Sequence, residues 1–299
     1  MDSIEEKRVY GDREGAVTAY VASAMGVVRV RVAGDTVGEF GLCERCEARD
    51  IAATRDAVAI ATDEDVRVHE VANEAAAETG DGDAADETFV EAGFGPAVAV
   101  GYDDGDLIAA SPDGRVACRA AGAEEWTTLE DVPVATVRAI DGDLVGTDNG
   151  VYRVHEGRLD HAGLTDVRDV SAAGVPLAAT ADGLYKLGNG WMAVLEPAFE
   201  TVAADPRSRP GRLERAHAVA GETIYEYAAD DDEWREREPD GSGETVVGFG
   251  YGDERYAVTE SGTFLSSSDG GWRRRLLGIT DVVGMAVPAT VPDATAAER

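Results

Sequence analysis

Short apolar stretches alternate with polar turns along most of the chain, and one strand-turn-strand pattern occurs repeatedly. The stretches TDNGVYRV (Thr147–Val154) and TADGLYKL (Thr180–Leu187) carry nearly the same eight letters 33 residues apart. In both, turn residues that tolerate a positive φ are followed by alternating apolar residues, as in a β-hairpin. The pattern therefore predicts antiparallel strands joined by tight turns.

The same hairpin recurs along the chain with a period near 40 residues. Seven such turns occur, separated by 39, 49, 36, 33, 40 and 39 residues. They are centred at Gly26, Asp65, Gly114, Gly150, Gly183, Thr223 and Gly262. Each turn is expected to join the second and third strands of a four-stranded unit. All four tryptophans fall in the expected fourth strand, at Trp126, Trp191, Trp234 and Trp272.

Four short strands at this period are typical of the blades of a β-propeller, so we predict an all-β, seven-bladed β-propeller. A β-sandwich or two small β domains are the alternatives, but neither explains seven evenly spaced copies. The propeller is expected to form a single domain over residues 1–299, with blades from about 15 to 288 and short terminal tails. The longest interval holds an acidic insertion, residues 72–88, which is predicted to be a flexible loop.

The two ends of the chain are expected to meet in one blade. Only one good strand, AVTAYVAS, precedes the turn at Gly26, and the C-terminal region holds an unpaired strand, DVVGMAVP (Asp281–Pro288). We therefore predict that blade one is closed by the N-terminal strands plus the C-terminal strand. Such a closure leaves no open sheet edge.

The charge composition indicates adaptation to high salt. The formal net charge is −32, with 59 acidic residues against 27 basic ones, and only Lys7 and Lys186 are lysines. This composition resembles that of haloarchaeal proteins. In molar salt the self-repulsion of an acidic surface is screened, so a large negative charge does not destabilise the fold there. Nucleic acid is not expected as a partner, since phosphates require a basic footprint.

Targeting features are not found in the sequence. The N-terminal MDSIEEKRVYGDREG is polar and lacks the apolar core of a signal peptide. No apolar stretch approaches the length of about 18 residues that a membrane span needs. Three cysteines cannot form a disulfide framework. We expect a cytoplasmic protein with no membrane contact and no cofactor.

One motif near the C-terminus resembles a known propeller hairpin. SSSDGGW (Ser266–Trp272) is similar to the Asp-box of sialidase-like propellers, Ser-x-Asp-x-Gly-x-x-Trp. Ser267, Asp269 and Gly271 match, whereas Trp272 follows the glycine at once, so the pattern is degenerate. The box is a structural turn in that family and implies the fold alone. As a whole, the chain resembles the uncharacterised seven-bladed β-propeller proteins of haloarchaea, a resemblance that implies no particular chemistry.

Three arginines share one position of the repeat. Arg49, Arg138 and Arg168 stand at the start of the innermost strand, in ARDI, VRAI and VRDV. In the predicted register they ring one mouth of the central channel, where guanidinium groups would suit a carboxylate or phosphate ligand. Alternatively, each pairs with a nearby acid, such as Asp50 or Asp169, in a salt bridge between blades. Because acids are abundant, the ion-pair interpretation is the simpler one.

The densest basic segment is DPRSRPGRLER, in the predicted loop between the first and second strands of blade six. Its arginines are candidates for binding an acidic partner, and they are Arg207, Arg209, Arg212 and Arg215. The acidic stretch ADDDE (Ala229–Glu233) is expected on the same face of the propeller. Neutralisation within the molecule is therefore the simpler interpretation.

Cys43 and Cys46 form a CERC motif in the predicted loop before the second blade. Such a pair can provide half of a zinc site or a redox pair. The other cysteine and the histidines lie elsewhere in the repeat without paired spacing, so no metal is assigned.

No catalytic motif is present, since the sequence lacks a P-loop, a GxSxG and an HExxH, and its four histidines are scattered. No catalytic residue is therefore assigned. The leading hypothesis is a non-enzymatic propeller that serves as a platform for protein interactions, with a protein partner that the sequence does not identify. The alternative is a hydrolase or lyase of small molecules or glycans, or a sensor of anionic ligands, at the arginine-lined mouth.

Overall fold

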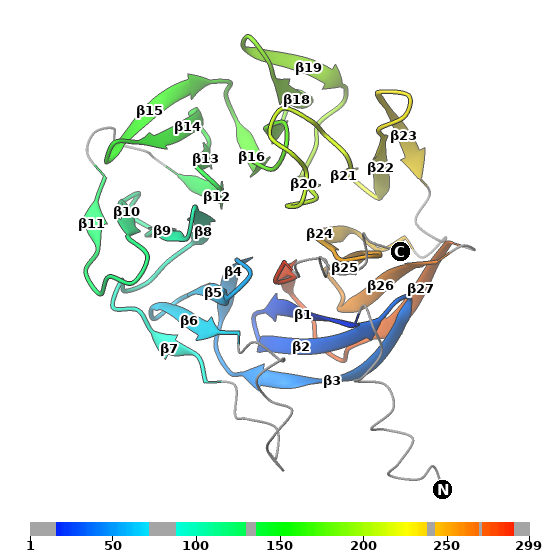
Figure 1. Ribbon diagram of the computed structural model, residues 1–299, viewed down its shortest axis with the longest axis horizontal. Helices are drawn as coiled ribbons and strands as arrows, with labels where there is room; N and C mark the ends of the chain where they lie inside the picture. Colours follow the sequence, from blue (N-terminus) through cyan, green and yellow to red (C-terminus); the bar gives the residue numbers. More distant parts are fainter. Residues whose placement is uncertain (1–15, 72–87, 130–135, 238–242, 269–270, 290–299) are drawn as a thin grey trace, which may run out of the picture.

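Seven four-stranded antiparallel sheets are arranged around a common axis in the computed structural model (Figure 1). The structure describes residues 16–71, 88–129, 136–237, 243–268 and 271–289. Within these residues, no helix is long and apolar enough to cross a membrane. The predicted seven-bladed propeller is confirmed. The predicted acidic insertion, residues 72–88, lies outside the described residues except for its last position.

The four strands of each sheet hold equivalent positions in every blade. The innermost strands are β4 (Ala48–Ala53), β8 (Ala99–Asp103), β12 (Val137–Asp141), β16 (Val167–Ser171), β20 (Thr201–Ala204), β24 (Val246–Tyr251) and β28 (Val282–Ala286). The second strands are β1 (Ala16–Ser23), β5 (Ala57–Thr62), β9 (Asp106–Ala110), β13 (Leu144–Thr147), β17 (Leu177–Thr180), β21 (Ala216–Ala220) and β25 (Arg255–Thr259).

The outer half of each blade follows the same scheme. The third strands are β2 (Gly26–Ala33), β6 (Val66–Glu70), β10 (Val116–Arg119), β14 (Gly150–His155), β18 (Leu184–Leu187), β22 (Thr223–Ala228) and β26 (Thr263–Ser268). The fourth strands are β3 (Thr36–Glu44), β7 (Val90–Glu91), β11 (Thr127–Thr128), β15 (Arg158–Gly163), β19 (Trp191–Leu195), β23 (Glu233–Arg237) and β27 (Gly271–Leu276). All seven predicted turns therefore join second and third strands.

Both ends of the chain build blade one, as predicted. Its strand order is β28-β1-β2-β3, so the last strand of the described residues is the innermost strand of the first blade. β28 pairs antiparallel with β1, with Met285 opposite Val21. This pairing closes the ring, because it covers the inner edge of β1 that would otherwise be open to other strands.

Apolar side chains on both faces of the sheets pack against the neighbouring blades. The buried apolar residues of the described chain fall into seven clusters, and each cluster lies between two successive blades. Between blades seven and one, for example, Val17 and Val28 pack with Tyr256 and Phe264. Burial on both faces explains why a middle strand such as β5 reads AVAIAT, an apolar run rather than a strict alternation.

The innermost strands require small residues because they crowd near the axis. A Cβ atom on Gly101 of β8 would lie 2.6 Å from Cγ2 and 2.7 Å from the carbonyl oxygen of Ile140 in the next blade. At the outer end, tryptophans link a blade to the one before it. The indole Nε1 of Trp191 donates a hydrogen bond to the carbonyl oxygen of Ala162 at 2.9 Å. Trp126 directly precedes its fourth strand rather than lying within it.

Candidate functional site

Five of the seven innermost strands contain a β-bulge at their second residue. The bulged residues are Arg49, Arg138, Arg168, Val247 and Val283. A bulge adds one residue to a strand and re-aims its side chain. All five residues line one cavity on the propeller axis. They stand where the innermost strands begin, on the face that carries the turns between second and third strands. We call this face the turn face.

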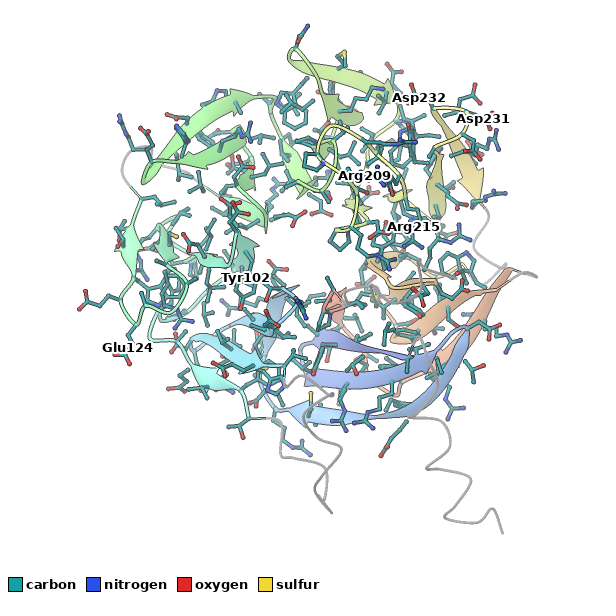
Figure 2. All side chains as sticks on the ribbon, in the orientation of Figure 1. Tyr102, Glu124, Arg209, Arg215, Asp231 and Asp232 are labelled. Carbon is teal, nitrogen blue, oxygen red and sulfur yellow. The ribbon has the colours of Figure 1, made fainter. Side chains whose placement is uncertain are left out.

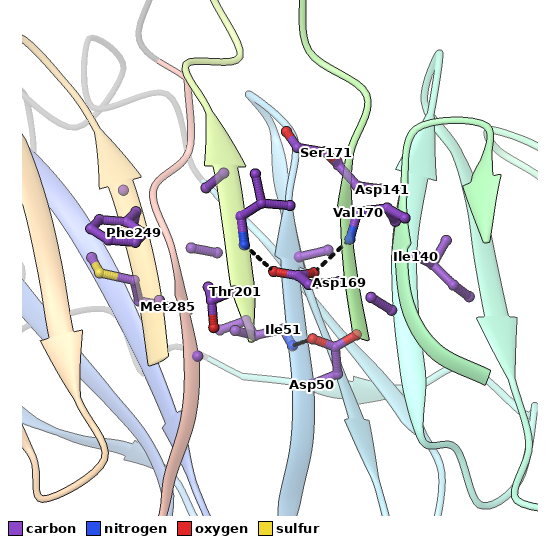
Figure 3. A pocket seen from close by; sticks show the side chains of 18 of the residues that line it. Asp50, Ile51, Ile140, Asp141, Asp169, Val170, Ser171, Thr201, Phe249 and Met285 are labelled. Carbon is purple, nitrogen blue, oxygen red and sulfur yellow. Dashed lines mark hydrogen bonds between the residues drawn. The ribbon is translucent and has the colours of Figure 1, made fainter. Parts of the chain in front are cut away.

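The innermost strands enclose a cavity of about 390 Å³ (Figure 3). One side of its wall is charged and comes from blades two, four and five, with Arg49, Arg138, Arg168, Asp50, Asp141 and Asp169. The other side is apolar and comes from blades seven and one, with Val247, Phe249, Val283, Met285 and Val287. This volume lies in the range of small-molecule sites, about 300–1,000 Å³.

Two aspartates of the cavity wall, both labelled in Figure 3, link neighbouring blades in the same way. Asp50 Oδ2 accepts a hydrogen bond from the backbone N–H of Val100 in blade three at 2.9 Å. Asp169 Oδ2 accepts the N–H of Val202 in blade six at 2.8 Å. The other oxygen of each carboxyl accepts the N–H of the following residue, at 2.8 and 2.9 Å. Each carboxyl therefore fastens two blades together.

A third aspartate completes this group. Asp141 Oδ2 accepts the N–H of Ala172 in blade five at 2.8 Å. Burial raises the pKa of Asp50 to about 7 and that of Asp169 to about 8, and it raises the pKa of Asp141 as well. The charges of Asp50 and Asp141 raise the pKa of Asp169 further. Two carboxyls of the cavity wall, those of Asp50 and Asp169, therefore have pKa values close to neutral pH.

Each arginine of the mouth has an acidic neighbour. The nitrogen–oxygen distances are 2.9 Å from Arg168 to Glu200, 3.3 Å from Arg138 to Asp166 and 3.8 Å from Arg49 to Glu47. The first two of these acids precede the innermost strand of the following blade, so their ion pairs do bridge blades. The acids named in the ion-pair interpretation, Asp50 and Asp169, bind backbone amides instead.

The basic segment connects β20 and β21, the first and second strands of blade six. Two of its arginines are neutralised by an acid of the same segment. Arg215 Nε lies 2.8 Å from Asp205 Oδ2, and Arg207 Nε lies 3.2 Å from Asp205 Oδ1. Arg215 Nη2 also donates to the carbonyl oxygen of Gly252 in blade seven at 2.9 Å. These contacts fasten blade six to blade seven.

The acidic stretch 229–233 joins the third and fourth strands of blade six, but two of its carboxylates, Asp231 and Asp232, have partners outside the basic segment. Asp231 forms an ion pair within its own hairpin, and Asp232 accepts a hydrogen bond from the hydroxyl of Tyr227 at 2.6 Å. Figure 2 shows Asp231 and Asp232 at the rim of the blade and Arg215 nearer the axis. Two arginines of the basic segment keep exposed side chains, Arg209 and Arg212.

The two cysteines of the CERC motif lie at the end of β3 and in the connection from β3 to β4. Cys43 belongs to β3 rather than to the predicted loop, and its Sγ lies 3.3 Å from the carbonyl oxygen of Val27. Burial raises the pKa of the Cys46 thiol to about 11, which disfavours the thiolate needed for metal binding. In the part of the chain that the structure describes, no group of three or more His, Cys, Asp or Glu side chains is arranged to hold a metal ion.

The sequence analysis did not identify four exposed apolar side chains at the turn-face ends of blades one and seven. Most of the exposed large hydrophobic side chains of the described chain lie on blades one and seven, namely Met25, Leu42, Leu276 and Val283, and we call these four residues the seam patch. The N–H of Ala24, beside Met25, donates to the carbonyl oxygen of Asp281 at 3.1 Å, which brings this turn to the start of β28. The available signal was the turn itself, which is Ala-Met in blade one, whereas the other six turns contain Asp or Glu.

Solved structures share the architecture at low sequence identity. The WD40 β-propeller domain of Doa1 has a TM-score of 0.60 and 16% identity, over 89% of this chain and 90% of that chain. AztD from Citrobacter koseri has a TM-score of 0.56 and 10% identity, over 91% and 98% of the two chains. YCF48 bound to D1 peptide has a TM-score of 0.52 and 13% identity, over 89% and 87%. These similarities show the fold.

Sequence comparison places the chain in a family. No curated protein matches the sequence. A family model described as Beta-prop_HVO_0234-like, beta propeller, matches residues 3–288. This match confirms the resemblance to haloarchaeal seven-bladed propellers, and the chain belongs to the HVO_0234-like β-propeller family.

Proposed function

We propose that the protein is a platform for protein interactions and that its main contact surface is the seam patch on the turn face. The observation that supports this proposal is the exposure of four large apolar side chains on a strongly acidic protein. Met25 is 54% exposed and Leu276 is 66% exposed. Apolar groups that gather on an otherwise polar surface mark contact sites, because covering them releases water.

The surroundings of the seam patch define the chemistry of the proposed partner. The equivalent turn of the adjacent blade two carries Asp63 and Glu64, and the turn of the adjacent blade seven carries Glu260. A matching protein segment would place an apolar side chain on Met25 and basic residues against these carboxylates. Propellers of this architecture do hold peptides, since YCF48 is bound to the D1 peptide.

The proposal is tested by affinity purification of the tagged protein from a haloarchaeal host at native salt, followed by mass spectrometry. The variant Met25→Asp places a charge in the seam patch. The matched control is Met192→Asp, because Met192 is 47% exposed on β19 of blade five, away from the patch. We expect a specific partner with wild type and Met192→Asp, and its loss with Met25→Asp. Recovery of the same proteins with all three would refute this surface.

The opposite face provides a second proposed contact in the same assay. Arg209 and Arg212 are exposed in the basic segment, whereas Arg207 and Arg215 are held by Asp205. An acidic partner that binds this loop would be lost from the double variant Arg209→Ala/Arg212→Ala and kept by Met25→Asp. A partner that both variants retain binds neither surface.

A further inference from the structure

We propose that the central cavity binds a small amphipathic carboxylate through its mouth on the turn face. The carboxylate would be held by Arg49, Arg138 and Arg168, and the apolar body would lie against Val247 and Val283. This inference goes beyond the protein-binding surface, because it concerns a small molecule inside the ring rather than a protein on its face. Of the residues named for the ligand, only Val283 also belongs to the seam patch.

The arginines retain donors for a ligand despite their acidic neighbours. A guanidinium group carries five N–H donors in a rigid fork that matches a carboxylate. Each of the three arginines lies within 4 Å of one carboxylate, and only Arg168 approaches its partner, Glu200, as closely as 2.9 Å. Their side chains are 31–36% exposed at the mouth. An incoming carboxylate can therefore accept further hydrogen bonds without displacing these acids.

The apolar side of the mouth distinguishes the ligand from a simple anion. Val247 and Val283 occupy the same bulge position in blades seven and one that the arginines occupy in blades two, four and five. Val283 is 38% exposed and lines the cavity, so its side chain is accessible to a ligand. Inorganic phosphate would leave this half of the site wet, whereas an alkyl chain attached to a carboxylate would cover it.

The aspartates limit how deep the negative group can lie. Asp50, Asp141 and Asp169 follow the arginine layer along the innermost strands, and their oxygens already accept backbone N–H groups. In their ionised form they have no donor and repel an anion, and in their protonated form they lack the positive charge of the guanidinium groups at the mouth. The carboxylate of the ligand therefore stays at the arginine layer.

Isothermal titration calorimetry at one fixed KCl concentration tests the inference, with octanoate, acetate and inorganic phosphate as probes. We expect one octanoate per chain, and binding of acetate and phosphate weaker by at least about ten-fold. The double variant Arg138→Gln/Arg168→Gln should weaken octanoate binding by at least about ten-fold. The matched control is Arg158→Gln, an exposed arginine on β15 of the same blade as Arg138, and it should bind like the wild type.

A further variant covers the case in which loss of the arginine ion pairs disturbs folding. Val247→Asp changes the apolar side without touching an ion pair, and it should also weaken octanoate binding. The proposal is overturned if octanoate shows no saturable binding, or if both the arginine and the valine variants bind it like the wild type. It is equally overturned if acetate or phosphate binds as tightly as octanoate.

Discussion

The raised pKa of a single carboxyl in the cavity wall predicts that the stability of the protein depends on pH. Burial raises the pKa of Asp169 from 3.8 to about 8. Between these two values the folded protein keeps a proton on this carboxyl, whereas the unfolded chain has released it. The stabilising contribution is therefore complete below about pH 4 and is lost as the pH rises through about 8.

Replacing this carboxyl should flatten the pH dependence. We expect the free energy of unfolding of the wild type to fall more steeply from pH 5 to pH 8 than that of Asp169→Asn, by at most about 1.4 kcal/mol per pH unit. Denaturant unfolding at fixed KCl across this range measures both slopes. Asp160→Asn, which changes an exposed acid on β15, should keep the slope of the wild type. Identical slopes for wild type and Asp169→Asn would show that the carboxyl is already ionised in the fold.

The role of these aspartates could not be predicted from the sequence, although their repeat position could. Asp50 and Asp169 follow an arginine in ARDI and VRDV, which made an ion pair between neighbours the natural interpretation. The bulge at the arginine changes which backbone groups the next carboxyl reaches, and it directs that carboxyl to an N–H of the adjoining blade. The pattern of apolar and polar residues does not reveal such a bulge. In a strand of only five or six residues, the pattern with an inserted bulge residue cannot be distinguished from that of a regular strand.

At the scale of elements, the close packing of the innermost strands is the most sensitive feature of the ring. A Cβ atom at position 101 would clash with both the side chain and the backbone of Ile140 in β12. We predict that Gly101→Ala lowers the free energy of unfolding by roughly 1–3 kcal/mol, as overpacking does elsewhere. Gly41→Ala on the outer strand β3 is the matched control, because no atom lies within 4 Å of its added Cβ. Equal stability of the two variants in denaturant would show that the blades can move apart at little cost.

Most elements were predictable because the strands and turns of every blade meet the same packing requirements. A middle strand that packs on both faces must be apolar, and the turn after it must reverse the chain, so both leave a clear pattern in the sequence. The outer strands β7 and β11 contain only two residues each, which is too short for a recognisable pattern of apolar and polar residues. Their positions could therefore be predicted only from the repeat and not from their own sequences. The seam patch was missed because exposure depends on which blades meet, not on local sequence.

Charge acts on the molecule as a whole. A net charge of −32 on a ring of seven packed sheets produces repulsion that no single ion pair offsets. At molar KCl the screening length is about 3 Å, whereas at 10 mM it is about 30 Å and reaches across several blades. We predict that the melting temperature falls by roughly 10 °C or more when KCl is reduced from molar to millimolar concentration. Circular dichroism at several KCl concentrations measures this change, and a constant melting temperature would contradict it.

Closure of the ring by β28 ties the stability of every blade to the C-terminal strand. Val282, Met285 and Val287 are buried against blades one and seven, at about 1.5–3 kcal/mol each. Their sum is comparable with the whole stability of a typical domain, about 5–15 kcal/mol. Deleting Asp281–Arg299 should therefore abolish the cooperative folding of the whole ring rather than loosen one end. The control is a deletion of residues 290–299 only, which leaves β28 in place and should preserve the melting transition. Calorimetry measures the melting transition of both truncated proteins. If the protein without β28 still melted cooperatively near the melting temperature of the full chain, the prediction would be wrong.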